Sequence, residues 1–156
     1  MRLKMSLKNI KNLILVVFLG FLLTACATSS RKPGKDYYTG SDTVKFLASG
    51  VPDRVFFATN RSSLHSGAKG TLNKQAAYIK SSGISVVVEG HADERGTREY
   101  NLALGERRAN AVKDYLMTYG ISGKRISVIS YGKERPVNPT SSPLAWSQNR
   151  RSVTVK

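Results

Sequence analysis

Residues 86–108 read VVVEGHADERGTREYNLALGERR, and this stretch decides the fold. A valine run ends at Glu89 and Gly90, a charged loop follows, and a helical pattern begins near Thr97 or Arg98. The short β-branched run predicts a strand buried on both faces, and apolar residues spaced three and four apart predict a helix. Because the loop between a strand end and a helix start often carries function in αβ proteins, we expect the functional site here.

The flanking segments complete an α+β domain with the element order β-α-β-α-β-β. Apolar runs, helical spacing and glycine stop signals predict its elements. In chain order these are a strand at 55–57, a helix at 66–82 that Gly83 ends, a strand at 85–89, a helix from 97 or 98 to 119 that Gly120 ends, a strand at 126–130, a helical turn at 144–148 and a strand at 152–155. We expect the helices to pack on one face of a small mixed four-stranded sheet.

The helix predicted for residues 97–119 carries an apolar stripe with a cation beside it. The stripe consists of Leu102, Gly105, Ala109, Val112 and Leu116. Arg108 lies at the edge of this stripe, where a guanidinium has to be paired or hydrogen-bonded to avoid a large desolvation cost. Two interpretations stay open, a structural ion pair with a nearby carboxylate and a site that receives an anion. Because the position is a pocket edge, we expect substitution of Arg108 to affect binding more than stability.

Asp93 follows the strand and precedes the helix, so it can approach Arg108 without touching it. A carboxylate and a guanidinium separated by a gap suit a zwitterion, whose carboxylate meets the arginine and whose ammonium meets the aspartate. The alternative is that Asp93 only caps or braces its loop. Asn101 shares the helix face of Arg108 and offers both a donor and an acceptor. We expect Glu94 and Glu99 to be solvated near the helix start.

His91 invites a metal or acid–base role. However, the spacing His-x-Asp-Glu matches no zinc signature, and His65 belongs to a different loop. A hydrogen-bonded structural role for His91 is therefore favoured. The sequence also shows no serine elbow, no second carboxylate for glycoside cleavage and no cysteine nucleophile in the folded part. These features indicate a binding module without cofactor or metal, and not an enzyme.

The N-terminal segment has the layout of an export signal. Arg2, Lys4, Lys8 and Lys11 precede an apolar run at 13–23, which is too short to span a bilayer comfortably. An amphipathic or buried core helix is the alternative, but no polar face interrupts the run.

The sequence Leu23-Thr24-Ala25-Cys26 resembles the bacterial lipobox. The resemblance implies that residues 1–25 are a lipoprotein signal peptide and that Cys26 carries S-diacylglycerol and an N-acyl group. Three acyl chains exceed the two signals that stable anchoring needs. Ala27 follows the cysteine, and by the same resemblance this directs the anchor to the outer membrane. The alternative is a buried thiol, and a lone cysteine excludes an internal disulfide.

Charge and composition bound the rest of the chain. Its 25 Lys and Arg against 10 Asp and Glu give a formal charge of +15. These cations are scattered without an aromatic-interleaved stripe, so we expect a basic surface that faces anionic polymer or lipid, and no nucleic-acid partner. Residues 26–45 are rich in small and polar residues and predict a flexible tether, and residues 46–156 predict one domain.

Several motifs carry a resemblance to a known family. They are GHADERGT at 90–97, Tyr100-Asn101, LGERRANAV at 104–112, Tyr115-Leu116, ISYGKERP at 129–136 and NRR at 149–151. Together they resemble the peptidoglycan-binding lipoproteins of the OmpA-like C-terminal domain family, over roughly residues 55–155. The resemblance implies an outer-membrane lipoprotein with its folded domain in the periplasm, which tethers the membrane to the wall.

The same resemblance implies a ligand and its site residues. Asp93 would take the ammonium of meso-diaminopimelate in the peptidoglycan stem peptide, and Arg108 its carboxylate. The residues implied to shape the pocket are Asn101, Leu104 and the backbone around Phe57, Gly90 and His91. TolB and the other Tol proteins are the implied protein partners, through a surface that overlaps this pocket, within a system that acts in envelope integrity and cell division.

One position departs from the family pattern. The first strand of such relatives usually ends Phe-Asp, whereas this chain has Phe57-Ala58. A pocket or TolB contact made by that acidic side chain is therefore not implied here. The alternative function is a wall-binding module of the same fold that recruits, or belongs to, a wall-processing or stator complex.

Overall fold

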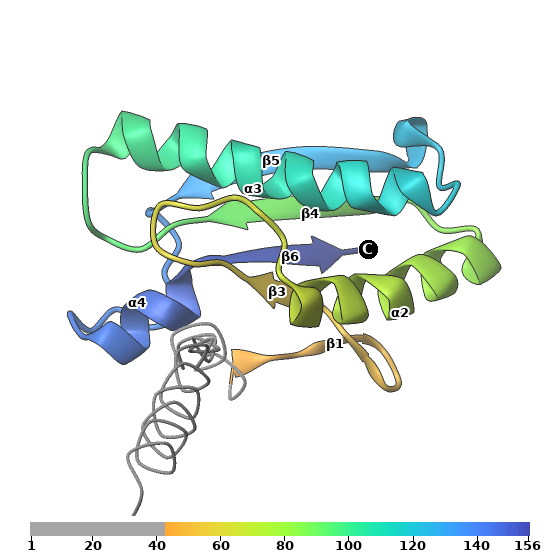
Figure 1. The fold of residues 1–156 in the computed structure, drawn as a ribbon, viewed down its shortest axis with the longest axis horizontal. Coiled ribbons are helices and arrows are strands. Elements are labelled where there is room, and N and C mark those ends of the chain that lie inside the picture. Colours follow the sequence, from red (N-terminus) through yellow and green to blue (C-terminus); the bar gives the residue numbers. More distant parts are fainter. Residues whose placement is uncertain (1–42) are drawn as a thin grey trace, which may run out of the picture. The chain divides into compact units, whose positions relative to one another are not determined.

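A computed structural model describes residues 43–156 (Figure 1). Its elements are β1 Phe46–Ala48, β2 Val51–Pro52, β3 Arg54–Phe56, α2 Ser66–Ser82, β4 Val86–His91, α3 Arg98–Thr118, the 3-10 helix η3 Gly123–Arg125, β5 Ile126–Gly132, α4 Pro143–Asn149 and β6 Arg151–Val155. The signal peptide, the lipidated cysteine and most of the tether proposed from the sequence lie outside the described residues. Within residues 43–156, no helix has both the length and the hydropathy to cross a membrane.

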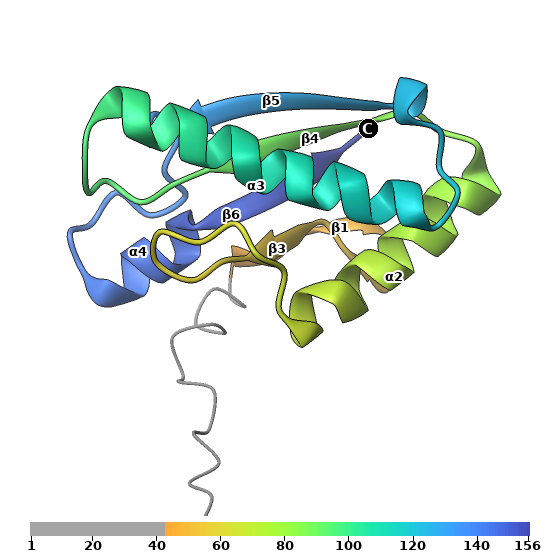
Figure 2. The same cartoon turned by 45° about the horizontal axis from the view of Figure 1, so that its top comes forward.

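The main sheet has four strands in the order β3-β6-β4-β5. Strand β4 runs parallel to β5, and β6 is antiparallel to both β3 and β4. Helices α2 and α3 share one apolar core with β3 and β4 and cover the same face of the sheet (Figures 1 and 2). The predicted α+β fold with helices on one face of a mixed four-stranded sheet is confirmed. A separate β1–β2 hairpin precedes it, which the sequence did not predict.

Local signals set the helix ends as predicted. Helix α2 begins after His65, whose ring Nδ1 accepts a hydrogen bond from the Ala68 N–H, and it ends at Gly83 in the left-handed conformation. The Thr97 hydroxyl caps α3 by accepting from the Tyr100 N–H. Gly120 follows the last turn of α3 with φ of 82°. A side-chain acceptor at the start and a glycine after the end satisfy backbone groups that a helix leaves unpaired.

The buried face of α3 is rotated relative to the predicted stripe. Leu102 is 48% exposed, so its assignment to the core was wrong. The buried residues of α3 are Asn101, Leu104, Gly105, Arg108, Ala109, Val112 and Leu116. At 3.6 residues per turn, this set centres the buried face near Val112 and Arg108, which moves Leu102 to the flank. Arg108 therefore points into the core and does not lie at its edge.

Strand β4 is covered fully on one face only. Val86 and Val88 are 2% and 0% exposed beneath the helices, while Val87 and Glu89 on the other face are half-buried. The expectation of burial on both faces was wrong, because both long helices lie on the same side of the sheet. The strand also continues past its predicted end at Glu89 to His91, with a bulge in its pairing to β5 after Gly90.

Two glycines let α3 approach β4 closely. A Cβ placed on Gly90 would overlap the backbone of Gly105 in α3. A Cβ placed on Gly105 would in turn lie 2.9 Å from the Gly90 carbonyl oxygen and collide with the Ser130 hydroxyl. Because backbone cannot yield as a flexible side chain does, only glycine fits at either position.

We expect Gly90→Ala to lower the free energy of unfolding by about 3 kcal/mol, because the new methyl group forces α3 away from the sheet. Urea unfolding of both variants measures this. Gly70→Ala is the matched control, since Gly70 lies in α2 with open space around its Cα. There the change should stabilise by about 1 kcal/mol through helix propensity. Equal effects of the two substitutions would contradict the close contact.

Candidate ligand-binding site

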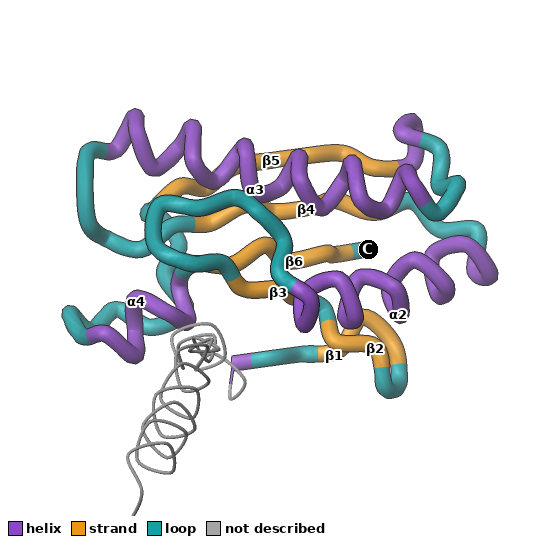
Figure 3. The backbone as a smooth tube through the Cα atoms, in the orientation of Figure 1, coloured by secondary structure: helices purple, strands orange, loops and turns teal. Residues whose placement is uncertain are grey.

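Arg108 is the largest fully buried side chain of the site, at 0% exposed. Its guanidinium donates to the backbone carbonyls of Arg61 at 2.9 Å, His91 at 2.7 Å and Ala58 at 3.1 Å. It also lies 5.2 Å from the centre of the Phe57 ring. The acceptors come from the end of β4 and from the loop between β3 and α2, which arches beside α3 in Figure 3. Because the acceptor at position 58 is a backbone carbonyl, this hydrogen bond does not depend on the side chain at that position.

The charge of Arg108 has no direct counter-ion. Among residues 43–156, no carboxylate lies within 4.0 Å of its guanidinium. Burial, and then the nearby Arg150, lowers the pKa of Arg108 to about 10, while attraction to Asp93 acts in the opposite direction. Of its five N–H groups, three are used by the carbonyls. The structure thus shows no ion pair at Arg108. Two N–H groups of its guanidinium are not used by these carbonyls, and the positively charged Arg150 lies nearby.

Asp93 is held by two other arginines. Its carboxylate accepts from Arg95 Nε at 3.0 Å and Arg95 Nη2 at 2.7 Å, and from Arg150 Nη1 at 3.5 Å. Burial alone raises the pKa of Asp93, but the hydrogen bonds and charge of Arg95 outweigh it and hold the pKa below its usual value. Asp93 therefore stays ionised, beyond ion-pair distance of Arg108.

Arg95 connects the loop after β4 to helix α4. Its guanidinium lies 4.2 Å from the centre of the Trp146 ring, and its Nη2 reaches the Thr59 hydroxyl at 3.5 Å. Its backbone carbonyl accepts from the Asn101 amide at 2.8 Å. Its side chain nevertheless stays 42% exposed. Arg95 thus combines several contacts with a partly exposed side chain.

Glu94 also reaches α4. Its carboxylate accepts from the Trp146 indole N–H at 2.8 Å and from the Ser141 hydroxyl at 3.0 Å. Both hydrogen bonds lower the pKa of Glu94. Glu94 is exposed, as expected, and its carboxylate also bonds to two partners far along the chain that the sequence did not predict.

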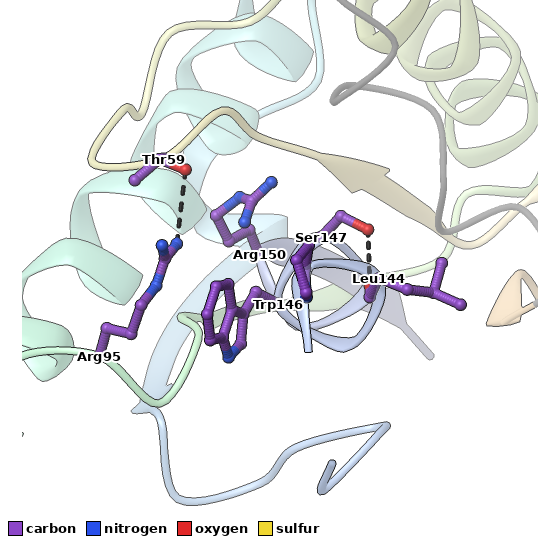
Figure 4. Close-up of a pocket in the computed structure, with 7 residues that line it drawn as sticks. Thr59, Arg95, Leu144, Trp146, Ser147 and Arg150 are labelled. Carbon is purple, nitrogen blue, oxygen red and sulfur yellow. Dashed lines mark hydrogen bonds between the residues drawn. The ribbon is translucent and has the colours of Figure 1, made fainter. Parts of the chain in front are cut away.

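A cavity of about 330 Å³ opens between this loop and α4. Its lining residues are Thr59, Arg95, Pro143, Leu144, Trp146, Ser147 and Arg150. Figure 4 shows the Arg95 guanidinium directed toward Thr59, with the Trp146 indole and Arg150 beside it. None of the 7 lining residues is acidic. The cavity is thus a cationic pocket with one aromatic wall.

The His91 side chain does not act as a hydrogen-bonded strut. Both ring nitrogens are buried without a hydrogen-bond partner among residues 43–156, and the nearest carboxylate oxygen, of Glu89, is 3.6 Å away. Burial, and then the positive charges of Arg151, Arg54 and Arg135, lowers the pKa of His91 to about 3. The structural role predicted from the sequence belongs to its backbone carbonyl, which accepts from Arg108.

The structure brings part of the predicted site together. Phe57, His91 and Arg108 meet through the Phe57 ring and the His91 carbonyl. Leu104 is buried, and Gly90 serves the contact between α3 and β4. Asn101 acts on the loop of Arg95 and makes no bond to Arg108.

Sequence reasoning missed three residues of the site, Arg95, Arg150 and Trp146. Arg95 stood in the recognised motif GHADERGT, two residues after Asp93, but neither signal shows that it pairs with Asp93. Trp146 lies far along the chain from the loop, in an element predicted only as a helical turn. Arg150 stood in a recognised motif, but its spacing alone does not show that it meets Asp93.

Comparison with known proteins assigns the chain to a family. The OmpA family model matches residues 56–150. The chain belongs to the OmpA family. It is 54% identical over 106 residues to a protein of Rhizobium meliloti named peptidoglycan-associated lipoprotein, covering 67% of this chain and 60% of that protein. A Mesorhizobium japonicum protein of the same name is 41% identical over 154 residues, covering 93% of this chain and 92% of its own length.

Solved structures of the OmpA family agree in fold. The crystal structure of the peptidoglycan-associated lipoprotein from Burkholderia pseudomallei has a TM-score of 0.64 and 38% identity, and covers 66% of this chain and 88% of that one. The C-terminal domain of Helicobacter pylori MotB has a TM-score of 0.60 at 22% identity, covers 65% of this chain and 81% of that one, and shows the fold alone. The predicted OmpA-like resemblance is confirmed. Membership in this family supports the prediction that the chain is a binding module and not an enzyme.

Arg108 is fully buried and does not lie at a pocket edge, so its substitution should lower stability as well as binding. We expect Arg108→Lys to lower the free energy of unfolding by about 2–4 kcal/mol, since one ammonium cannot reach carbonyls from three separate positions. Urea unfolding measures the change. The matched control is Arg107→Lys on the exposed side of the same helix, which should stay within about 0.5 kcal/mol of the parent. Similar losses at both positions would contradict the buried role.

The lowered pKa of His91 predicts acid-sensitive stability. Below pH 6.5 His91 is protonated in the unfolded chain, whereas in the folded chain it stays neutral until the pH reaches about 3. The free energy of unfolding therefore decreases as the pH is lowered through this window, by about 2 kcal/mol from pH 7 to pH 5. Urea unfolding at both values checks this. In His91→Gln most of this pH-dependent decrease should disappear. The remainder comes from His65, because burial lowers the pKa of that side chain too. An unchanged fall in the variant would exclude His91 as its origin.

Proposed function

We propose that this chain is an outer-membrane lipoprotein that binds peptidoglycan non-covalently through meso-diaminopimelate. The observation that carries the proposal is Arg108, a buried guanidinium with two spare donors and no carboxylate partner among residues 43–156, near the ionised Asp93. A carboxylate and an ammonium on one ligand group would satisfy both side chains. Relatives at 41–54% identity are named peptidoglycan-associated lipoprotein, which supports this ligand.

Access to Arg108 requires a rearrangement. Its guanidinium is fully shielded, so the ligand carboxylate reaches it only after a neighbouring group has moved. A buried guanidinium that is already fixed by three carbonyls then needs little reorganisation of its own. Asp93 contributes the opposite charge, held by arginines that the ligand ammonium partly replaces.

The proposed anchor is Cys26, through S-diacylglycerol and an N-acyl group. With lipid in the outer membrane and the domain of residues 46–156 on the wall, the chain tethers the two layers. TolB and other Tol proteins are the proposed protein partners, through a surface overlapping the same site. Membership in a stator or wall-processing complex is the second candidate, and the MotB likeness at 22% identity, which shows the fold alone, does not favour it.

A change in the ligand tests Arg108 without altering the core. We expect the purified full chain to bind a diaminopimelate-containing stem peptide at least about tenfold more tightly than the lysine-containing one, which lacks only the carboxylate that Arg108 would take. That ratio corresponds to about 1.4 kcal/mol. Isothermal titration measures both affinities. Equal affinities would falsify the proposed ligand.

Asp93→Asn tests the other half of the site. Because the neutral amide cannot form an ion pair with the ammonium, the affinity for the diaminopimelate peptide should fall at least about tenfold. Glu99→Gln removes an acid from the exposed first turn of α3 and should leave the affinity within about twofold. Thermal unfolding of each variant establishes that the fold is kept. A folded Asp93→Asn variant with full affinity would remove Asp93 from the site.

A further inference from the structure

The cavity between the loop of Arg95 and α4 faces the same site as Asp93 but has no role in the ligand scheme above. Arg95 and Arg150 both line it, and both also bond to Asp93. These two arginines thus connect the carboxylate that would receive the ligand ammonium to the open cavity.

Arg95 occupies the place that an ammonium needs. Its fork covers both oxygens of Asp93, at 3.0 and 2.7 Å. A cationic ligand group must displace at least one of these bonds, since the Asp93 side chain is only 9% exposed and already has Arg150 as a second cation. With a 42% exposed side chain, Arg95 has more room to turn away than Arg150, whose side chain is 5% exposed.

The direction in which Arg95 turns follows from its surroundings. The Trp146 ring supports its guanidinium from one side, and the Thr59 hydroxyl lies at 3.5 Å on the cavity wall. With its partner Asp93 given to the ligand, the guanidinium faces a 330 Å³ cavity whose lining includes Arg150 and no acid. Two guanidiniums at one cavity favour an anion there, and a carboxylate matches the arginine fork.

We propose that this cavity is a second subsite for the stem peptide, in which Arg95 exchanges Asp93 for a second carboxylate of the ligand. This inference rests on the proposed function. Stem peptides supply such a group, because the glutamyl residue beside diaminopimelate and the terminal residue each carry a free carboxylate. The exchange leaves neither Arg95 nor Asp93 unpaired, since one arginine–carboxylate pair inside the protein is replaced by an ammonium–carboxylate pair and an arginine–carboxylate pair with the ligand.

The test is a double cycle between the protein and the ligand. The ligand is a diaminopimelate tetrapeptide, compared with two derivatives in which the glutamyl or the terminal carboxylate is a carboxamide. The proteins are the full chain, its Arg95→Gln variant and Arg98→Gln as control. Arg98 is an exposed arginine of the same region that pairs with Glu134 at 3.3 Å, so its removal changes the net charge equally.

We expect one of the two carboxamides to bind the parent about tenfold more weakly, which identifies the carboxylate used. Arg95→Gln should bind the unmodified peptide about tenfold more weakly, and the same carboxamide should then cause no further loss. Arg98→Gln should keep the full difference between the ligands. Carboxamides that bind the parent as well as the tetrapeptide, or losses that simply add in Arg95→Gln, would overturn the second subsite.

Trp146 gives an independent readout, because it is the only tryptophan of the chain and Arg95 lies over its ring. The tetrapeptide should change its fluorescence in the parent and in Arg98→Gln, but not in Arg95→Gln. The same response in all three would show that Arg95 does not move. If the second subsite fails while Asp93→Asn still weakens binding at least about tenfold, the proposed function stands. If the parent does not prefer diaminopimelate over lysine, both proposals fall.

Discussion

The buried guanidinium of Arg108 is the interaction on which the rest of the site depends. A charge at 0% exposure persists only where acceptors replace water, and here three carbonyls from β4 and from the loop after β3 do so. These bonds fasten α3 to both segments. Carbonyl dipoles stabilise a cation without cancelling its charge, so the fold keeps a positive field that a structural ion pair would have removed.

The fold reaches this arrangement through a contact that carries no charge. Gly90 and Gly105 let α3 approach β4 at backbone distance. Arg108 lies one turn further along α3, and the His91 carbonyl one residue beyond Gly90, so the same approach brings the guanidinium within 2.7 Å of that oxygen. A bulkier residue at either glycine would separate donor from acceptor. Packing and site geometry are therefore one constraint.

Local signals made most of the fold predictable, while the site depended on contacts that are distant in sequence. Periodicity and glycine stop signals placed both ends of α2 and the glycine after α3 correctly, because these depend on neighbouring residues. Leu102 was wrongly assigned to the core. The contact between Gly105 and Gly90, which a hydrophobic stripe does not reveal, turns the side of α3 that carries Arg108 toward the sheet. Trp146 and Arg150 reach the loop across more than fifty residues, so no spacing rule points to them.

The arginines around Asp93 also explain how the site would discriminate between ligands. Three guanidiniums, of Arg95, Arg108 and Arg150, gather around one buried carboxylate. A ligand that brings only an ammonium displaces Arg95 and adds a fourth cation, leaving Arg108 uncompensated. A ligand that brings carboxylates with its ammonium restores the balance. Selectivity against lysine-type peptides would then come from the penalty of uncompensated positive charge, and not only from a missing attraction.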